Sequence, residues 1–438
     1  MGVLVDRALE LLLPGRLGSR FRLLFWSTLA SNLGDGIALA AGPLLMAAQT
    51  RDPILIALAG LLPRLPWLLF GLHAGVVADR LDRRRIMVAA NLTRAGVLGV
   101  LVLTIVTGTV SAVVVLTVLF LLGTAETLAD TATITVPPMI LASEQLGLAN
   151  SRLIGAHLTV NQLVGPSVGA VLFVGGMSLP FVLQGVLLIQ AAVLAGRIDL
   201  RRSTVTAPAS VADAAAGRPR IRTEIADGLR WLRDHPPIRT LTLTIVAFNI
   251  TFGAAFAVLV LYAIERLGLG EVGFGLLHTT LAAGGVVGAA GYGWLERRYS
   301  LADLMRAGLV IETLTHLVLA LTEQTAVAFP ILFLFGIHAS VWGTTASSIR
   351  QRAVPEELQG RVGGVYMTGV QGGIVIGAAL GGVLADAFGI TAPIWFAFAG
   401  SAVLLVLLWR ELEHVAHADG GTRPVASPDA GPGPDPEQ

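Results

Sequence analysis

The sequence predicts an all-α membrane protein with twelve transmembrane helices in two six-helix bundles. Three observations lead to this fold class: the composition, the number of long apolar runs, and an internal repeat. Of the 438 residues, 54% are hydrophobic and 13% are charged, whereas a soluble domain carries about 25% charged residues. A chain of this composition is typical of a protein embedded in lipid.

Two residue types, cysteine and lysine, are missing from the sequence. Without cysteine, disulfides and thiolate metal sites are excluded. Without lysine, the P-loop of an ATP-driven pump is excluded. No HExxH motif or other metal-ligand spacing is present, so an enzyme is not expected. We expect a small-molecule substrate, protons and the lipid bilayer as partners, and no nucleotide, nucleic acid, metal or cofactor.

Twelve apolar runs have the length of a membrane helix, which needs about 20 mostly apolar residues. The runs of the first half are 22–48, 53–78, 86–107, 111–136, 152–175 and 178–197. The runs of the second half are 239–263, 272–294, 301–322, 325–347, 362–386 and 391–410. They predict an N-terminal bundle over 21–197 and a C-terminal bundle over 239–412.

Three polar segments flank and join these bundles. Residues 1–20 form a short N-terminal segment without a signal-peptide cleavage site. The linker 198–238 contains TEIADGLRWLRDHPP, in which Ile225, Leu229 and Leu232 stand at helical spacing. We expect an amphipathic helix at the membrane surface there. The tail 413–438 is rich in Pro, Gly and Asp and is predicted to be disordered.

The arginines predict the orientation in the membrane. All 30 basic residues are arginine, and an even number of spans places both termini on one side. Loops on that side carry most of the arginines, whereas the opposite side carries Arg51 and Arg266. The positive-inside rule therefore places both termini in the cytoplasm of a bacterial cell.

The two halves of the sequence resemble each other. NLTRAG at 91–96 returns as DLMRAG at 303–308, which pairs Arg94 with Arg306 at an offset of 212. Further pairs have similar offsets: Asn32 with Asn249, Gly75 with Gly291, Gly165 with Gly377, and Gly169 with Gly381. A repeat in the same topological sense predicts two bundles related by an axis along the membrane normal, with the substrate site between them.

The motif GVVADRLDRRR at 75–85 ends the second span. Its residues Gly75, Asp79, Arg80, Arg83 and Arg84 resemble the loop signature of the major facilitator superfamily, GxxxDRxGRR. The resemblance implies that Asp79 caps a helix N-terminus across the bundle interface, and that Arg80 and Arg83 hold carboxylates or helix C-termini at a cytoplasmic gate.

This motif departs from the family pattern at two places. Asp82 stands where the signature usually has glycine, so a differently made turn is expected. The second copy, GYGWLERR, keeps Gly291, Arg297 and Arg298 but has Leu295 in place of the aspartate. We expect one of the two gates to dominate.

A second motif, NQLVGPSVGA at 161–170, lies inside the fifth span. Gly165, Pro166 and Gly169 are similar to the Gly-Pro motif of the family's exporters, GxxxGPxxGG, and a Gly-Pro pair allows a helix to kink. The same letters satisfy the hydrolase pattern GxSxG, but that pattern needs a strand-to-helix turn. The segments 31–45 and 355–364 resemble the enterobactin-exporter and macrolide-efflux branch.

Charged residues inside the spans are candidates for function. By rise per residue, Asp35 lies about 20 Å and Arg64 about 22 Å from the cytoplasmic end of their spans. We expect these two to pair or to share a water. Asp35 either carries a proton across the membrane or forms a structural ion pair, and the sequence leaves both interpretations open.

The fourth span adds Glu126 and Asp130, which share one helix face. Arg94 lies at a similar depth, which predicts a structural Arg94–Glu126 ion pair or, alternatively, a proton or cation site. In the ninth span, Glu312 and His316 are four residues apart, and Glu312 is the only obvious acidic mate for Arg306. A structural role is favoured for this pair.

The superfamily resemblance implies that the first, fourth, seventh and tenth spans line the central cavity. It adds Asn32, Asn249, His338 and Trp342 as substrate-contact candidates. The sequence as a whole predicts a monomeric, proton-coupled exporter of an amphipathic drug, macrolide or siderophore that works by alternating access. An importer or uniporter of the same fold, or a non-transporting sensor or lipid scramblase, are the alternatives.

Overall fold

The computed structural model describes residues 14–200 and 221–416, and in these ranges the regular structure is helical. The predictions for 1–13, 201–220 and 417–438 lie outside the described residues. The first half contains η1 (Gly15–Leu17), α2 (Gly18–Gln49), α3 (Pro53–Leu61), α4 (Leu65–Arg80), α5 (Arg83–Val106), α6 (Ala112–Ile134), α7 (Pro137–Ile140), α8 (Ser143–Ala156), the π-helix η2 (His157–Val164), α9 (Gly165–Gly175) and α10 (Leu179–Gly196).

The second half begins with α12 (Ile221–Asp234) in the linker. The elements that follow are α13 (Pro236–Ala257), α14 (Leu259–Leu261), η3 (Tyr262–Arg266), α15 (Glu271–Arg298), α16 (Leu301–Leu321), α17 (Thr325–Ala353), η4 (Glu356–Leu358), α18 (Gln359–Phe388), α19 (Ala392–Leu408) and α20 (Glu411–Ala416).

All twelve apolar runs expected to span the membrane are helical. Among the described residues, ten helices are long and apolar enough to cross a bilayer, and a bent pair within the second run makes an eleventh candidate. The twelfth is the apolar α19, which has 17 residues. The bend in the second run measures 43° and follows from Pro66, which has no N–H to donate and whose ring clashes with the carbonyl of Leu62.

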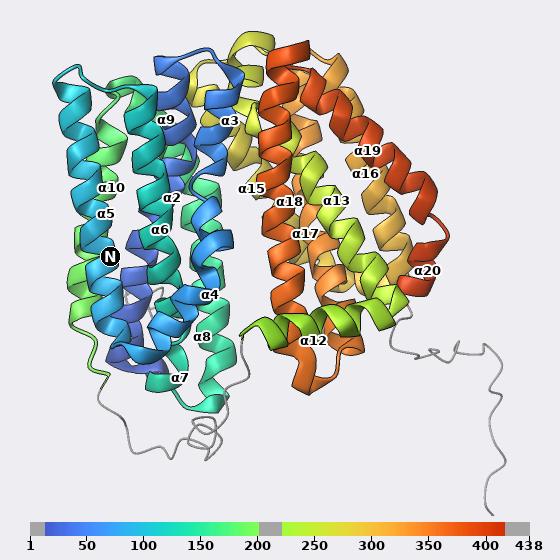
Figure 1. Ribbon diagram of the computed structural model, residues 1–438, viewed down its shortest axis with the longest axis horizontal. Helices are drawn as coiled ribbons and strands as arrows, with labels where there is room; N and C mark the ends of the chain where they lie inside the picture. Colours follow the sequence, from blue (N-terminus) through green and yellow to red (C-terminus); the bar gives the residue numbers. More distant parts are fainter. Residues whose placement is uncertain (1–13, 201–220, 417–438) are drawn as a thin grey trace, which may run out of the picture.

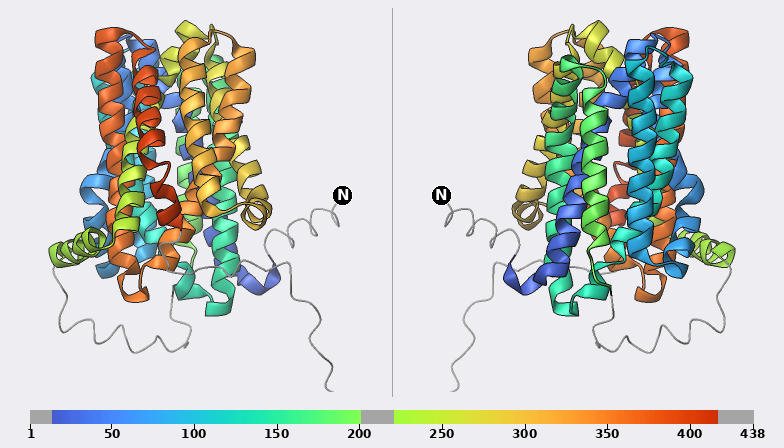
Figure 2. Two further views of the ribbon diagram at one scale, coloured as in Figure 1. Left: turned by 90° about the vertical axis from the view of Figure 1, so that its right-hand side faces the viewer. Right: turned by 90° about the vertical axis from the view of Figure 1, so that its left-hand side faces the viewer.

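The helices of each half stand side by side (Figure 1), and most are nearly parallel (Figure 2). In the first half α2 packs against α9 and α10, and in the second half α13 packs against α18 and α19. The halves meet where α9 packs against α15 and α3 against α18. Toward the lower end of Figure 1 the ribbons of the two halves diverge.

Glycines at close helix contacts test the internal repeat. A Cβ added to Gly169 would collide with the backbone carbonyl of Ile37 on α2, and one added to Gly381 would collide with that of Ala254 on α13. Ile37 and Ala254 are 217 residues apart, the same offset as Asn32 and Asn249. The predicted equivalence of the first and seventh spans is therefore confirmed.

The predicted equivalence of Arg94 and Arg306 is wrong. Asp82 caps α5 and Ser300 caps α16. Arg94 lies twelve residues after its cap, whereas Arg306 lies six residues after its own. The six-letter similarity that aligned them is a local match, displaced by six residues from the register of the helices. The residue at the depth of Arg94 is Glu312.

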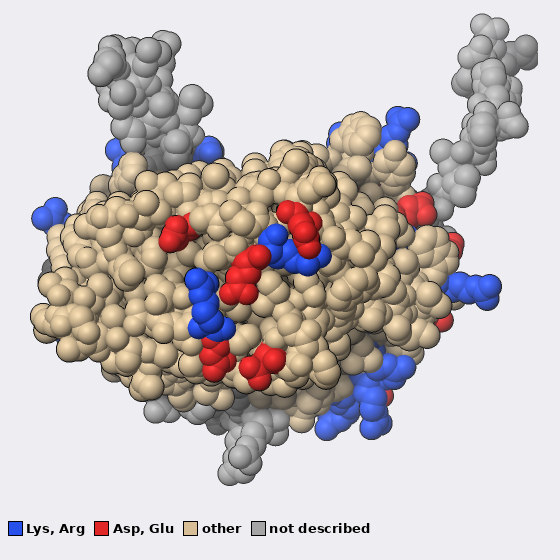
Figure 3. Space-filling view, turned by 90° about the horizontal axis from the view of Figure 1, so that it is seen from above, with Lys and Arg blue, Asp and Glu red and all other residues tan. Residues whose placement is uncertain are grey.

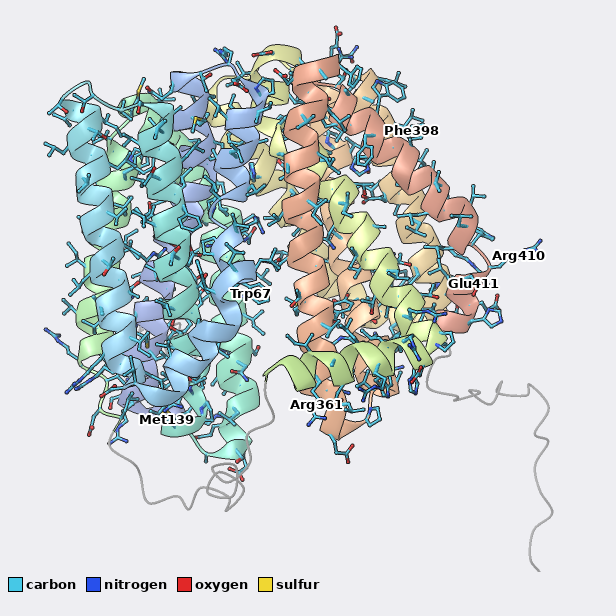
Figure 4. The ribbon with its side chains drawn as sticks, viewed as in Figure 1. Trp67, Met139, Arg361, Phe398, Arg410 and Glu411 are labelled. Carbon is cyan, nitrogen blue, oxygen red and sulfur yellow. The ribbon has the colours of Figure 1, made fainter. Side chains whose placement is uncertain are left out.

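The linker helix α12 lies across the lower end of the second half (Figures 1 and 2). Gly228 approaches the backbone of Arg361 on α18, and Leu232 is buried. Arg361, labelled in Figure 4, pairs with Asp227 at 3.2 Å. Ile225 and Leu229 remain exposed, so the expected apolar face is divided: part packs on protein, and part faces outward.

The start of the tail also differs from the prediction. Residues 413–416, expected to be disordered, belong to α20, where Leu412 and Val415 are buried in the core of the second half. Glu413 of this helix pairs with Arg306 at 3.0 Å. The apolar pair Leu412 and Val415 gives this short segment enough buried area to fold against α13 and α16.

Candidate functional site

A network of charged side chains lies inside the first half, centred on Arg94 of α5. The Arg94 side chain is 1% exposed. Its guanidinium donates to the Asp35 carboxylate on α2 and to Ser31 Oγ, 3.2 Å away. Glu126 of α6 lies 3.6 Å from the same guanidinium. Three helices thus contribute to one buried ionic site, and the predicted Arg94–Glu126 ion pair is confirmed.

The charges of this network do not balance within it. A buried guanidinium requires a partner because its desolvation is costly, and Asp35 supplies one. Glu126 is 35% exposed, and Asp130 follows one turn later on α6 with its side chain exposed. With Arg64 close enough to Glu126 to interact with it electrostatically, two guanidiniums therefore stand against up to three carboxylates. Such a site favours the uptake of a positive charge, either a proton or a cation.

A small polar pocket lies directly beside this network. The residues that line it come from α2, α5 and α6, and they are Ser27, Thr28, Ser31, Asn32, Met87, Asn91, Ala129, Asp130 and Thr133. The pocket has a volume of about 20 Å³, room for about one water that its hydroxyl and amide groups could hold next to Asp130.

The predicted pairing of Asp35 with Arg64 is wrong, because Asp35 pairs with Arg94. Arg64 stands at the break between α3 and α4, and its side chain is exposed. The prediction used depth along a straight helix, but the second span bends at this residue. Depth also fixes only the height of a side chain, not the direction in which it points.

The Gly-Pro motif lies where a π-helix meets an α-helix. The π-helix η2 ends at Val164, and Gly165 and Pro166 begin α9. A Cβ at Gly165 would collide with Gly36 of α2, so the glycine permits close contact of the first and fifth spans. π-Helical turns are rare and frequently mark functional sites.

Asn32 contacts this π-helix rather than an open surface. Its Oδ1 lies 3.0 Å from Nδ1 of His157, and its carbonyl accepts from Asn161 at 3.1 Å. The substrate-contact role of Asn32 remains a prediction. In this structure its amide oxygen contacts His157 of the fifth span.

The loop motif is described only in part. The surroundings of Gly75, Asp79 and Arg80 lie outside the part of the chain whose side chains the structure describes. Their predicted gate contacts therefore remain predictions. Arg83 and Arg84 begin α5 and are half-buried. The Asp82 carboxylate accepts from the Arg84 N–H at 2.9 Å. This N-cap replaces the glycine turn of the family signature.

The second copy of the motif ends α15. A Cβ added to Gly291 would meet no atom within 4 Å, so this glycine is not at a close helix contact. Arg297 and Arg298 are exposed, and the Arg298 guanidinium lies 5.9 Å from the Trp294 ring.

The other substrate-contact candidates lie inside the second half. Asn249, His338 and Trp342 are 8%, 3% and 2% exposed. The Asn249 amide donates to the carbonyl of Ile245 on its own helix. In contrast, Trp67 of α4 lies at the edge of the first half that faces the second half (Figure 4). Sequence reasoning did not single out Trp67.

The second half contains a titratable cluster that sequence reasoning regarded as structural. Glu312 is fully buried, with Oε2 3.2 Å from His338 Nε2 and Oε1 3.5 Å from His316 Nδ1. The i,i+4 spacing of Glu312 and His316 was the only signal for it in the sequence. The sequence suggests Glu312 as the acidic partner of Arg306. In the structure Arg306 pairs instead with Glu413 and Asp303.

The arrangement of helices and the ionic network inside the spans define a multi-pass membrane transporter of the major facilitator superfamily. The chain belongs to the family described as transmembrane secretion effectors, whose sequence profile matches residues 16–422. Members of this superfamily are transporters and not enzymes.

Known proteins are similar to this chain over most of its length. The multidrug efflux pump Tap of Mycolicibacterium fortuitum is 29% identical, over 84% of this chain and 90% of Tap. Macrolide efflux protein A of Streptococcus pyogenes is 21% identical, over 82% of this chain and 87% of that protein. The crystal structure of the nucleoside transporter NupG has a TM-score of 0.73 at 11% identity, covering 90% of this chain and all of NupG, and confirms the fold.

Proposed function

We propose that this protein is a proton-coupled exporter of amphipathic small molecules in the bacterial cytoplasmic membrane. The observation that carries the proposal is the buried guanidinium of Arg94, shared between Asp35 and Glu126 inside the spans. The relatives named as multidrug and macrolide efflux proteins support drugs or macrolides as the substrate class.

The chemistry of coupling follows from the excess of carboxylates. Glu126 and Asp130 share a face of α6 and are more exposed than Asp35, which stays next to Arg94. A proton that binds a carboxylate gives a neutral carboxylic acid and releases that group from Arg94. A cationic or polarised substrate competes for the same negative charge. Binding of the substrate and binding of the proton therefore exclude each other, as antiport requires.

The contacts between the halves support an alternating-access cycle. Thr279 of α15 donates to the carbonyl of Leu163 at 2.7 Å and lies 2.7 Å from Ser167. Arg51 and Glu265, which follow α2 and end η3, join the halves at 3.7 Å. Figure 3 shows the upper face of the molecule as mostly uncharged, with a few charged groups near its centre.

The lower end of the molecule differs from the upper end in the spacing of the two halves and in the number of arginines. The ribbons of the two halves diverge there (Figure 1), and the arginine-rich loops lie on that side. We propose that rocking of the halves about the contacts between them exposes Asp35, Glu126 and Asp130 to each side in turn.

Inside-out vesicles with an imposed proton gradient, acid inside, test this function. Drugs and macrolides are added, and collapse of the gradient is followed for wild type, Asp35→Asn and Glu126→Gln. Glu271→Gln, at the start of α15 and outside the network, is the matched control. We expect collapse in wild type and in Glu271→Gln, and loss of collapse in Asp35→Asn or Glu126→Gln.

Other outcomes distinguish the alternatives. Collapse that survives both network substitutions would contradict coupling at this site. No collapse with any compound, together with counterflow of labelled compound in the absence of a gradient, would indicate a uniporter. Movement of labelled compound out of the vesicle lumen, in the same direction as the protons, would indicate an importer.

A further inference from the structure

The cluster around Glu312 has the organisation of a binding site rather than of a structural ion pair. Five of its polar atoms are buried and make no hydrogen bond with the protein in the described part of the chain: Glu312 Oε1, Thr315 Oγ1, His316 Nε2, His338 Nδ1 and Trp342 Nε1. Buried polar groups are normally hydrogen-bonded, and several unpartnered groups in one place require an explanation.

The helices make room for this cluster. A Cβ added to Gly308 on α16 would collide with the indole of Trp342 and lie 2.8 Å from His338 Nδ1. Gly308 is one turn before Glu312, so its missing side chain leaves the space that the imidazole and the indole occupy. The polar groups are therefore gathered by the backbone geometry of α16 and α17.

Aromatic rings of α13 and α17 lie against the cluster. Phe248 of α13 stacks on Trp342 at 5.9 Å and lies 5.9 Å from the ring of His338. Phe335 of α17 lies 5.7 Å from His338 and 6.1 Å from His316. Phe248 is 8% exposed, whereas Glu312 is fully buried. A movement of α13 against α17 would therefore be enough to admit water.

Hydrogen-bond geometry defines how the cluster holds protons. His316 Nδ1 lies 3.0 Å from the carbonyl of Glu312, which accepts, so Nδ1 carries a proton and is not available to the carboxylate. The exchangeable proton then lies between Glu312 Oε2 and His338 Nε2, 3.2 Å apart. With it, the pair is a carboxylic acid and an imidazole, or a carboxylate and an imidazolium, and both are neutral overall. Without it, an uncompensated carboxylate is left in a dry bundle, which is strongly unfavourable.

Other charged groups do not neutralise this carboxylate. α19 contains no titratable residue, and α13 presents Phe248 to the cluster. On the other described helices packed against α16 and α17, charged groups lie at the helix ends or are held elsewhere. His278 bonds the carbonyl of Phe274, Tyr292 contacts Thr345, and Arg306 pairs with Glu413.

The geometry points to a second proton-binding site, formed by Glu312 and His338 and oriented by His316, that binds one proton when the bundle is dry and releases it to water when α13 moves away. The released proton leaves the carboxylic acid as a hydrated proton, and Glu312 becomes a solvated carboxylate. This site lies in the half opposite to the Asp35 network. It does not depend on the identity of the substrate.

Infrared difference spectroscopy of the purified full-length protein in lipid, between acidic and alkaline pH, tests the site directly. We expect a carboxylic-acid carbonyl band that disappears as the pH rises and is missing in Glu312→Gln. Thr315→Val, which changes a buried unpartnered hydroxyl on the same turn without removing a titratable group, should keep the band. His338→Gln should keep the band but move its midpoint.

The control outcomes separate folding from titration. Identical pH-difference spectra for wild type and Glu312→Gln would overturn the proposal, because Glu312 would then hold one protonation state. If Glu312→Gln does not fold, an unchanged midpoint in His338→Gln would overturn it instead. These readouts require no transport, so they remain decisive even if the exporter function proposed above is wrong.

Discussion

The two halves of this transporter share helix packing but carry opposite charge at corresponding positions. Twelve residues after its cap, α5 contributes Arg94, and at the same position α16 contributes Glu312. Arg94 is flanked by carboxylates, and Glu312 is flanked by imidazoles.

Both charges lie next to helices that pack in the same way. A Cβ at Gly123 of α6 would collide with the carbonyl of Pro63, and one at Gly336 of α17 with that of Leu281. Glu126 and His338 follow these glycines by three and two residues. The comparison teaches that duplication preserved the backbone contacts, while the ionic groups between the helices diverged.

The largest effect that tests the comparison is expected at Arg94. Arg94→Gln leaves the Asp35 carboxylate without its charged partner, and breaking a buried ion pair costs about 3–5 kcal/mol. The thermal unfolding midpoint in detergent should fall strongly, and transport should be lost. Arg64→Gln is the comparison and should cost less stability, since its side chain is exposed and acts on Glu126 only at longer range. Equal damage from both substitutions would favour the Asp35–Arg64 pairing predicted from sequence.

The equivalent glycines Gly169 and Gly381 should respond alike. Alanine at either position collides with a backbone carbonyl of the first or seventh span, and overpacking costs about 1–3 kcal/mol. We expect similar losses of thermal stability for Gly169→Ala and Gly381→Ala. Gly291→Ala, with open space around the added methyl group, should be neutral. A large difference in stability between Gly169→Ala and Gly381→Ala would contradict the equivalence of these two helix contacts.

The helix caps should show a smaller paired effect. Asp82→Ala and Ser300→Ala each remove a side chain that accepts from a backbone N–H of the following helix, at a cost of about 1 kcal/mol. Asp82→Gly, which restores the residue of the family signature, should cost only about a few tenths of a kcal/mol. Denaturant titration measures both. If glycine were as damaging as alanine, Asp82 would have a role besides capping.

The smallest effect is expected at Arg306. Its ion-pair partner Glu413 is 65% exposed, and exposed ion pairs contribute about 0–1 kcal/mol. The Arg306 side chain itself is 19% exposed and also donates to the Trp409 carbonyl at 2.8 Å, a hydrogen bond that contributes about 1 kcal/mol. Arg306→Gln should keep transport in the vesicle assay and shift the unfolding midpoint little. Loss of transport as complete as in Arg94→Gln would show that the sequence alignment of the two arginines, and not the helix register, describes their function.

The spans and the repeat could be predicted because hydropathy and glycine spacing are local properties. The twelve runs, and the equivalence of Gly169 with Gly381, required only the length of apolar segments and their spacing. The pairing of Arg94 and Arg306 failed because six similar letters carry too little information to fix a register. Helix caps at Asp82 and Ser300 would have corrected it.

The ionic sites were predictable in composition but not in pairing. Asp35, Arg94 and Glu126 were recognised because charges inside apolar spans are costly and therefore conspicuous. Their partners depend on which way each helix face is turned, and the bend beside Arg64 changed that for the second span. His338 is a cavity candidate in the sequence because the superfamily resemblance implies that the tenth span lines the cavity. Its contact with Glu312, 26 residues away in sequence, depends on how α16 and α17 pack.

The π-helix η2 gives the fifth span a degree of freedom that an α-helix lacks. A π-turn accommodates surplus backbone within a continuous helix. If η2 took α-helical geometry, its one surplus residue would have to be accommodated elsewhere in the chain. α8 would then rotate by about 100° relative to α9, because each residue of an α-helix turns by that angle. His157 would then turn away from Asn32, while Gly165 and Gly169 kept their contacts with α2. The π-helix thus stands between the segment of the fifth span that is held against α2 by Gly165 and Gly169 and the segment α8 that precedes it.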